Sequence, residues 1–101
     1  MTALKIVWST PAKKQFDDLH KRAIAAGRLD DFLAAHAEVV RILGDLEKAT
    51  EKSDPLYSAK KPGGMVRHLV HRFLSVTFHL YPDESVVCIA RYVPVPSTWP
   101  F

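Results

Sequence analysis

The chain has 101 residues, of which 48% are hydrophobic and 25% are charged, and its formal net charge is +3. We interpret residues 1–101 as a single globular domain, because this length and mixture are typical of one. No stretch approaches the roughly 18 apolar residues of a transmembrane helix, and the N-terminus does not resemble a secretory signal, so we expect no membrane partner. Cys88 is the only cysteine, which excludes an intramolecular disulfide and a cysteine-based metal site and favours a cytosolic protein.

The first half of the chain predicts a strand followed by two helices. Residues 4–8, LKIVW, are β-branched, apolar and aromatic, as strand residues commonly are. Ser9 or Thr10 can cap a helix in which apolar residues recur at helical spacing until Gly27. A second amphipathic helix spans about residues 30–50. We expect the two helices to form an αα-hairpin.

The second half predicts a loop and then a three-stranded antiparallel meander. Residues 53–64 contain prolines and glycines without periodicity, which indicates a loop. Strand-like segments follow at residues 65–71, 74–81 and 85–93, and the PDES sequence between the last two has the composition of a hairpin turn.

The order of these elements, β-α-α-β-β-β, places the chain in the α+β class. Both helices precede the meander, and we expect them to cover one face of the sheet. Alternation along residues 74–81 then divides that strand between the two faces. Leu74, Val76, Phe78 and Leu80 point toward the helices, whereas Ser75, Thr77, His79 and Tyr81 lie on a face that is left partly open.

A turn that pairs Pro82 with Ser85 sets the register of the last two strands. This register predicts four opposed pairs: Leu80–Val87, Phe78–Ile89, His79–Cys88 and Ser75–Tyr92. The same register places Arg91 on the apolar face beside Val76, where its aliphatic stem can carry the charge to solvent.

Positive charge and histidine are concentrated in the meander. From Pro55 to Pro82 there is no Asp or Glu, whereas the window contains four basic residues and three of the five histidines. These residues are Lys60, Lys61, Arg67, His68, His71, Arg72 and His79. RNA cleavage without a metal needs groups that transfer protons near neutral pH and cations that stabilise the phosphate. The window contains both kinds of group.

Strand alternation divides these candidates between the two faces. Arg67 and His71 share one face, while His68 and Arg72 share the other, so only one pair can join His79. His68 and His71 therefore form no zinc site, and we expect no metal and no cofactor. The alternative interpretation is the solvated polar face of an ordinary sheet. Another histidine, His36, lies on the apolar face of its helix, and we interpret it as a core-edge residue with a hydrogen-bond partner.

The layout resembles the RelE/ParE superfamily, the toxin components of bacterial type II toxin–antitoxin modules. The resemblance rests on VWSTPAKKQFDDL at residues 7–19, GGMVRHLV at residues 63–70 and CIARYV at residues 88–93. It covers about residues 4–95. It implies the same fold that the periodicity predicts.

The resemblance also implies activities and a protein partner. RelE-like members cut messenger RNA on the ribosome, ParE-like members inhibit DNA gyrase, and a cognate antitoxin neutralises both. We favour translation inhibition by a metal-independent endoribonuclease. In that interpretation Arg67, His71 and His79 are catalytic, and Lys60, Lys61, His68, Arg72, Arg91 and Tyr92 contact the substrate.

Two alternatives stay open. One is a gyrase inhibitor that depends on exposed residues of the helices or of the C-terminus, such as Trp99 and Phe101. The other is a binding relative of the fold without toxicity. The C-terminal sequence VPVPSTWPF contains no Lys, Arg, His or Tyr, whereas cleaving members of the superfamily carry basic residues and a tyrosine there.

Overall fold

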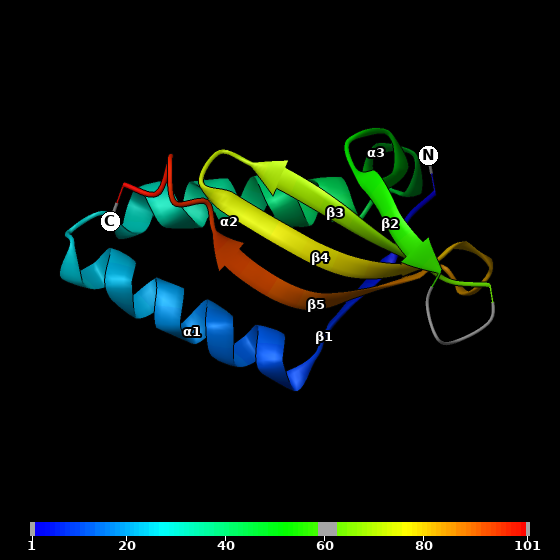
Figure 1. Ribbon diagram of the computed structural model, residues 1–101, viewed down its shortest axis with the longest axis horizontal. Coiled ribbons are helices and arrows are strands. Elements are labelled where there is room, and N and C mark those ends of the chain that lie inside the picture. Colours follow the sequence, from blue (N-terminus) through cyan, green and yellow to red (C-terminus); the bar gives the residue numbers. More distant parts are fainter. Residues whose placement is uncertain (1, 59–62, 101) are drawn as a thin grey trace.

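The computed structural model describes residues 2–58 and 63–100 and has the predicted α+β order with three additional elements, which are a third α-helix, a further strand and a short 3-10 helix. Figure 1 shows β1 (Lys5–Trp8), α1 (Thr10–Ala25), α2 (Leu29–Leu43), α3 (Leu46–Glu51), β2 (Asp54–Ser58), β3 (Met65–His71), β4 (Leu74–Tyr81) and β5 (Val86–Pro94), with a 3-10 helix (Pro82–Glu84) in the last turn. Among the described helices none is both long and apolar enough to cross a membrane.

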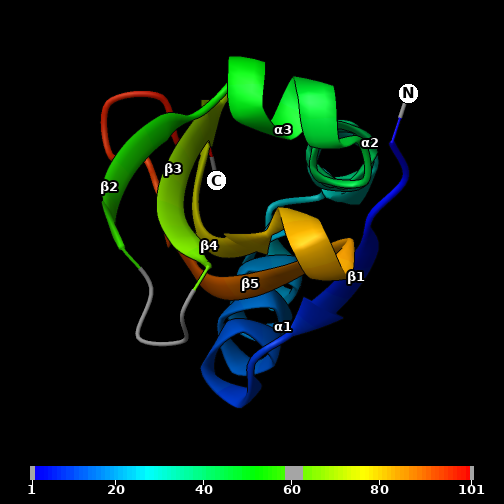
Figure 2. The ribbon, with the colours of Figure 1, turned by 90° about the vertical axis from the view of Figure 1, so that its right-hand side faces the viewer.

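The strands form one five-stranded sheet in the order β1-β5-β4-β3-β2. β1 runs parallel to β5, and the other neighbours are antiparallel. Figure 2 shows that the sheet curves strongly from β2 to β5. In Figure 1, α2 lies behind the sheet, so one face is covered as expected and the other is turned toward the viewer.

The predicted helix over residues 30–50 is two helices, because the chain turns at Gly44. The Asp45 side chain caps α3 by accepting from the backbone N–H groups of Glu47 and Lys48, as aspartate commonly does at this position. Backbone bonds from Leu4 to Gly44 and from Leu46 to Thr2 fasten the turn to the chain before β1. The interruption is therefore held by a distant segment of the chain.

The predicted loop over residues 53–64 contains a further strand, β2, at the edge of the sheet. β2 pairs antiparallel with β3, and its register shifts between Pro55 and Tyr57. Proline has no N–H to donate to a ladder, so it is found in strands mainly at edges and bulges. The same residue type that indicated a loop is thus compatible with this edge strand.

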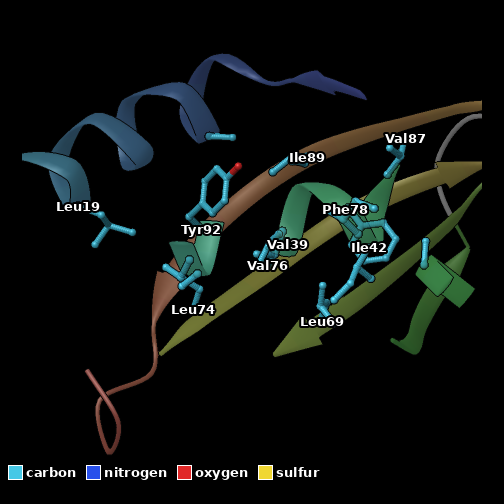
Figure 3. Packing of buried hydrophobic residues seen from close by; sticks show 14 of the residues in the cluster. Leu19, Val39, Ile42, Leu69, Leu74, Val76, Phe78, Val87, Ile89 and Tyr92 are labelled. Atoms are coloured by element: carbon cyan, nitrogen blue, oxygen red, sulfur yellow. The ribbon is translucent and has the colours of Figure 1, made fainter. Parts of the chain in front are cut away.

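The core lies between the covered face of the sheet and the helices, as Figure 3 shows. The alternation predicted for β4 is confirmed, because Leu74, Val76, Phe78 and Leu80 are buried while the residues between them are half-buried. Phe32, Val39 and Leu43 of α2 are fully buried against the sheet side chains. Burying each such side chain contributes about 1.5–3 kcal/mol.

The pairing of β4 with β5 is irregular at one point, which changes the predicted register. The pairs Leu80–Val87, His79–Cys88 and Phe78–Ile89 are confirmed, but Thr77 then pairs with Arg91, so Ala90 is an extra residue in β5. Such a β-bulge shifts the following residues by one position, and a shift of one exchanges the two faces. The predicted Ser75–Tyr92 pair is therefore wrong: Tyr92 is opposite Val76, and Arg91 leaves the covered face.

The start of α1 holds the bulge in place. The Ser9 hydroxyl donates to the carbonyl of Ala90 at 3.0 Å and accepts from the N–H of Ala12 at 3.1 Å, so the residue that caps α1 also binds β5. Two residues beyond the bulge, the N–H of Tyr92 donates to the Gln15 side chain at 2.8 Å. β1 pairs with β5 only as far as Ile89, and α1 satisfies the edge of β5 after that point.

Tyr92 joins three elements inside the protein. Its hydroxyl accepts from the Trp8 indole N–H at 2.8 Å and lies 2.8 Å from Nε2 of His36. A buried hydroxyl hydrogen needs an acceptor, so we assign the hydroxyl as the donor to Nε2, which places the His36 hydrogen on Nδ1. Burial lowers the pKa of His36 and raises the pKa of Tyr92 to about 12. The expectation of a hydrogen-bonded histidine at the core edge is confirmed.

The C-terminal segment packs against the helices and the β3–β4 turn. The N–H of Val95 donates to the carbonyl of Phe73. The Trp99 ring lies edge-on to Phe32 and Phe73, and the Arg22 guanidinium lies 4.9 Å from its centroid. Trp99 is thus a partly buried packing residue, which corrects the expectation of an exposed side chain there. Phe101 lies outside the described residues.

We expect Tyr92→Phe to lower the free energy of unfolding by about 1–3 kcal/mol, because the change leaves the Trp8 N–H and His36 Nε2 without their partner. Urea unfolding followed by circular dichroism measures the change. The matched control is Tyr57→Phe, since Tyr57 is 63% exposed and its loss of a hydroxyl should change stability by less than about 0.5 kcal/mol. Equal effects of the two substitutions would disprove the role of the Tyr92 hydroxyl.

Stability should also depend on the protonation of His36. Because burial lowers its folded-state pKa below 6.5, the unfolded chain binds more protons in the window just below pH 6.5, and stability falls as the pH falls through it. His36→Gln removes this titration. We therefore expect the wild-type protein to lose more stability than His36→Gln between about pH 7 and pH 5, measured by urea unfolding at each pH. Parallel pH profiles of the two proteins would contradict the assignment.

Candidate nucleic-acid interface

The face of the sheet opposite the core, here called the open face, carries side chains from all five strands. Strand pairing places on it Lys5, Val7, Asp54, Tyr57, Val66, His68, Val70, Ser75, Thr77, His79, Tyr81, Val86, Cys88, Arg91 and Val93. Lys5, Asp54, Tyr57, Val70, Arg91 and Val93 are exposed, Val66 is buried, and the others are half-buried. Figure 1 shows this surface from the front, with no helix crossing it.

One row of the open face brings together groups that suit a phosphate. His68 and Arg91 both lie opposite Thr77, one on each side. Opposed side chains have Cβ atoms about 4.5–5.5 Å apart, so the imidazole and the guanidinium flank Thr77 on neighbouring strands. His79 follows two residues after Thr77 on the same face, which places it diagonally about 7–8 Å from His68. The register thus places two imidazoles and one guanidinium at neighbouring positions of β3, β4 and β5.

Ser75 orients one of these imidazoles. Nε2 of His68 is hydrogen-bonded to the Ser75 hydroxyl. On the other side, His68 lies opposite Asp54 of the edge strand β2. Asp54 is the only acidic residue in the five strands as they are described, so the open face carries the two cations Lys5 and Arg91 against one carboxylate. The orienting role of Ser75 has no signal in the sequence, because the contact depends on the β3–β4 register.

The structure places Arg67 and His71 on the covered face, away from His79. Arg67 Nε donates to the Ser53 hydroxyl at 2.7 Å, and its Nη2 donates to the carbonyls of Thr50 and Ser53, both at 2.9 Å. The Thr50 carbonyl lies in the last turn of α3 and the Ser53 carbonyl just after it, where such acceptors lack helical partners. Arg67 therefore fastens β3 to the end of α3, and the three residues that the sequence grouped as catalytic do not lie together.

His71 lies at the end of β3 near α2. Its charge contributes to a lowered pKa of Glu38, which the hydrogen bond from Arg41 lowers most. Arg72 follows in the turn between β3 and β4 with a positive φ of 57°, and its guanidinium lies over the Phe73 ring. Neither side chain belongs to the open face.

The remaining residues that the sequence predicted to contact the substrate do not lie together either. Tyr92 is only 2% exposed and its hydroxyl is bound inside the protein, so its ring offers no stacking surface. Arg91 lies on the open face, whereas the predicted register placed it on the covered face. Lys60 and Lys61 lie outside the described residues. Within the described part of the chain, no three His, Cys, Asp or Glu side chains lie close enough together to hold a metal ion.

Comparison with known proteins yields a likeness of fold. No protein-family model matches the sequence, and no curated protein is significantly similar to it. Among solved structures, the chain is similar to one from the "Chromosomal ParDE TA system from P. aeruginosa", with a TM-score of 0.60 and 18% sequence identity. The alignment covers 94% of this chain and 99% of that one. This chain therefore shares its fold with a chain of that system, which agrees with the fold that the sequence resemblance implied.

Proposed function

We propose that the protein is the toxin of a bacterial toxin–antitoxin module and that it acts on RNA through the open face. The observation that carries this proposal is the joint position of Arg91, His68 and His79 on an uncovered and acid-poor sheet surface. The likeness to a chain of a ParDE system supports the toxin–antitoxin part. The target that we favour is messenger RNA in the ribosome, as the sequence resemblance implies.

The open face has the groups for cleavage without a metal. The 2′-hydroxyl of the RNA attacks the adjacent phosphorus, and its proton passes to one imidazole, for which His79 is our candidate. The bond from phosphorus to the 5′-oxygen breaks, and the second imidazole, His68, gives its proton to that leaving oxygen. The Arg91 guanidinium stabilises the negative charge on the phosphate. The products are a 2′,3′-cyclic phosphate and a free 5′-hydroxyl.

The predicted protein partner is a cognate antitoxin. A cell that made an active toxin alone would stop growing, so an antitoxin must be present wherever the toxin is expressed. We expect a short reading frame beside the gene to encode it, and we expect co-expression of that frame to restore growth.

Gyrase inhibition is the second candidate, and two observations favour it. The similar structure is a ParDE system, and the superfamily resemblance associates ParE-like members with gyrase. In addition, the helical hairpin exposes Ile24 at 52% and Leu33 at 41%. Exposed apolar side chains of this size are common anchors in protein–protein contacts.

Induced expression in a bacterial host distinguishes the targets. If the toxin cleaves messenger RNA, incorporation of labelled methionine should fall before that of labelled thymidine. His79→Gln should restore protein synthesis, since general acid–base catalysis contributes about 10²–10⁴-fold. The matched control is His71→Gln, the same substitution on the covered face, which should remain toxic.

The outcomes separate the candidates. A block of DNA synthesis that His79→Gln does not relieve would replace RNA cleavage with gyrase inhibition, and Ile24→Ser should then relieve it. If His71→Gln abolished toxicity and His79→Gln did not, the catalytic histidine would lie on the covered face, and our assignment would be disproved. Normal growth on induction of the folded protein would leave the non-toxic relative as the function.

Arg91 should act through its charge on the phosphate. We expect Arg91→Gln to weaken binding of the purified protein to single-stranded RNA, and to reduce the slope of log K against log salt by about 0.7, the value for one phosphate contact on a single strand. Fluorescence anisotropy at several salt concentrations measures both. The control is Arg72→Gln, which removes the same charge from the turn, and an equal slope change there would refute a specific Arg91 contact.

A further inference from the structure

A pocket lies between β1, α1 and α2, away from the open face. Its volume is about 240 Å³, and its lining residues are Trp8, Lys13, Phe16, Asp17 and His36. It is thus built by the end of β1, the first half of α1 and the middle of α2. None of these residues belongs to the surface that we assign to RNA.

The walls of this pocket are aromatic and the position of each ring is fixed. Phe16 packs against His36 with their centroids 4.6 Å apart, and it also packs against Phe32 and Tyr92 at 5.5 and 6.0 Å. Trp8 and His36 are both tied to the Tyr92 hydroxyl. Rings held in this way need little reordering when a ligand binds, which favours affinity.

The pocket contains one fixed hydrogen-bond donor. His36 Nε2 lies 2.8 Å from the Tyr92 hydroxyl, and our assignment of that hydroxyl as the donor places the His36 hydrogen on Nδ1. Within the described residues Nδ1 has no hydrogen-bond partner, and it is not among the fully buried polar atoms. A donor that is accessible and unpaired at an aromatic pocket can bind an acceptor oxygen of a ligand.

We propose that this pocket binds one aromatic side chain of a partner polypeptide, with a backbone carbonyl of that polypeptide accepting from His36 Nδ1–H. The volume is below the roughly 300–1,000 Å³ of sites for drug-sized ligands, and it suits a single ring. The two remaining lining residues, Lys13 and Asp17, are exposed and of opposite charge, so they can pair with charged residues on either side of the anchor. Aromatic residues in such pockets are typical hot spots of protein–protein contacts.

N-acetyl-L-phenylalaninamide is a suitable probe, because it has the ring and the carbonyls but no charge. Titration of the isotope-labelled protein by NMR should give saturable shifts of the Trp8 indole and the His36 ring, with a Kd in the millimolar range that is expected for so small a ligand. Intermolecular NOEs should connect the ring protons of the probe to Trp8 and Phe16. N-acetylglycinamide, which lacks the ring, should cause no saturable shift.

Two adjacent variants test the location. Lys13→Trp places an indole at the pocket and should weaken binding of the probe at least tenfold, whereas Lys14→Trp makes the same change at an exposed neighbour that does not line it and should leave the Kd within twofold. Absence of NOEs to Trp8, equal shifts with N-acetylglycinamide, or equal Kd values for the two variants would each overturn the proposal. The experiment uses purified protein alone, so its result does not depend on toxicity.

Discussion

One extra residue in β5, Ala90, determines which side chains this protein buries and which it presents. Without the bulge, strand alternation would direct Arg91 into the core and Tyr92 toward solvent. With it, Arg91 joins Thr77 on the open face and Tyr92 enters the core opposite Val76. The bulge leaves the carbonyl of Ala90 outside the regular ladder, and the Ser9 hydroxyl satisfies it. The start of α1 thereby supports both surfaces of the protein, through this bond and the bond from the Tyr92 N–H to the Gln15 side chain.

The two faces of the sheet consequently have different chemistry. On the covered face, Arg67 donates hydrogen bonds to the carbonyls at the end of α3. The charge that the sequence suggested for catalysis therefore has a structural role. On the open face Arg91 is exposed, and the imidazoles of His68 and His79 come from adjacent strands. A face on which cations outnumber carboxylates in this way is suited to our proposal of an RNA target, because its field as well as its contacts would attract a polyanion. The face of the sheet on which a basic residue lies, more than its type, thus distinguishes a candidate site residue such as Arg91 from a structural one such as Arg67.

On the helical side, polar groups at the core edge serve packing first. Tyr92 brings the hydroxyl that Trp8 and His36 share, and this network fixes the rings of the pocket between α1 and α2. Nε2 of His36 is hydrogen-bonded to the Tyr92 hydroxyl, whereas Nδ1 has no partner among the described residues. His36 therefore contributes both to the core and to the pocket. Buried polar groups are costly unless they are paired, which explains why the tyrosine and the histidine occur together. The same pairing leaves a donor for a ligand.

Local periodicity in the sequence was sufficient to predict the α+β order, the alternation of β4 and the pairing near its turn, because these depend on residues close together in the chain. The edge strand β2 was missed because Pro55 signals a loop and an edge strand alike. The break at Gly44 and the bulge at Ala90 were missed because contacts with distant residues hold them, in the second case across 81 positions between Ser9 and Ala90. A one-residue insertion leaves almost no local signal, yet it exchanges the faces of every residue that follows it. The sequence therefore specified which polar side chains were available, and the register of the folded sheet decided that His68, His79 and Arg91 share the open face.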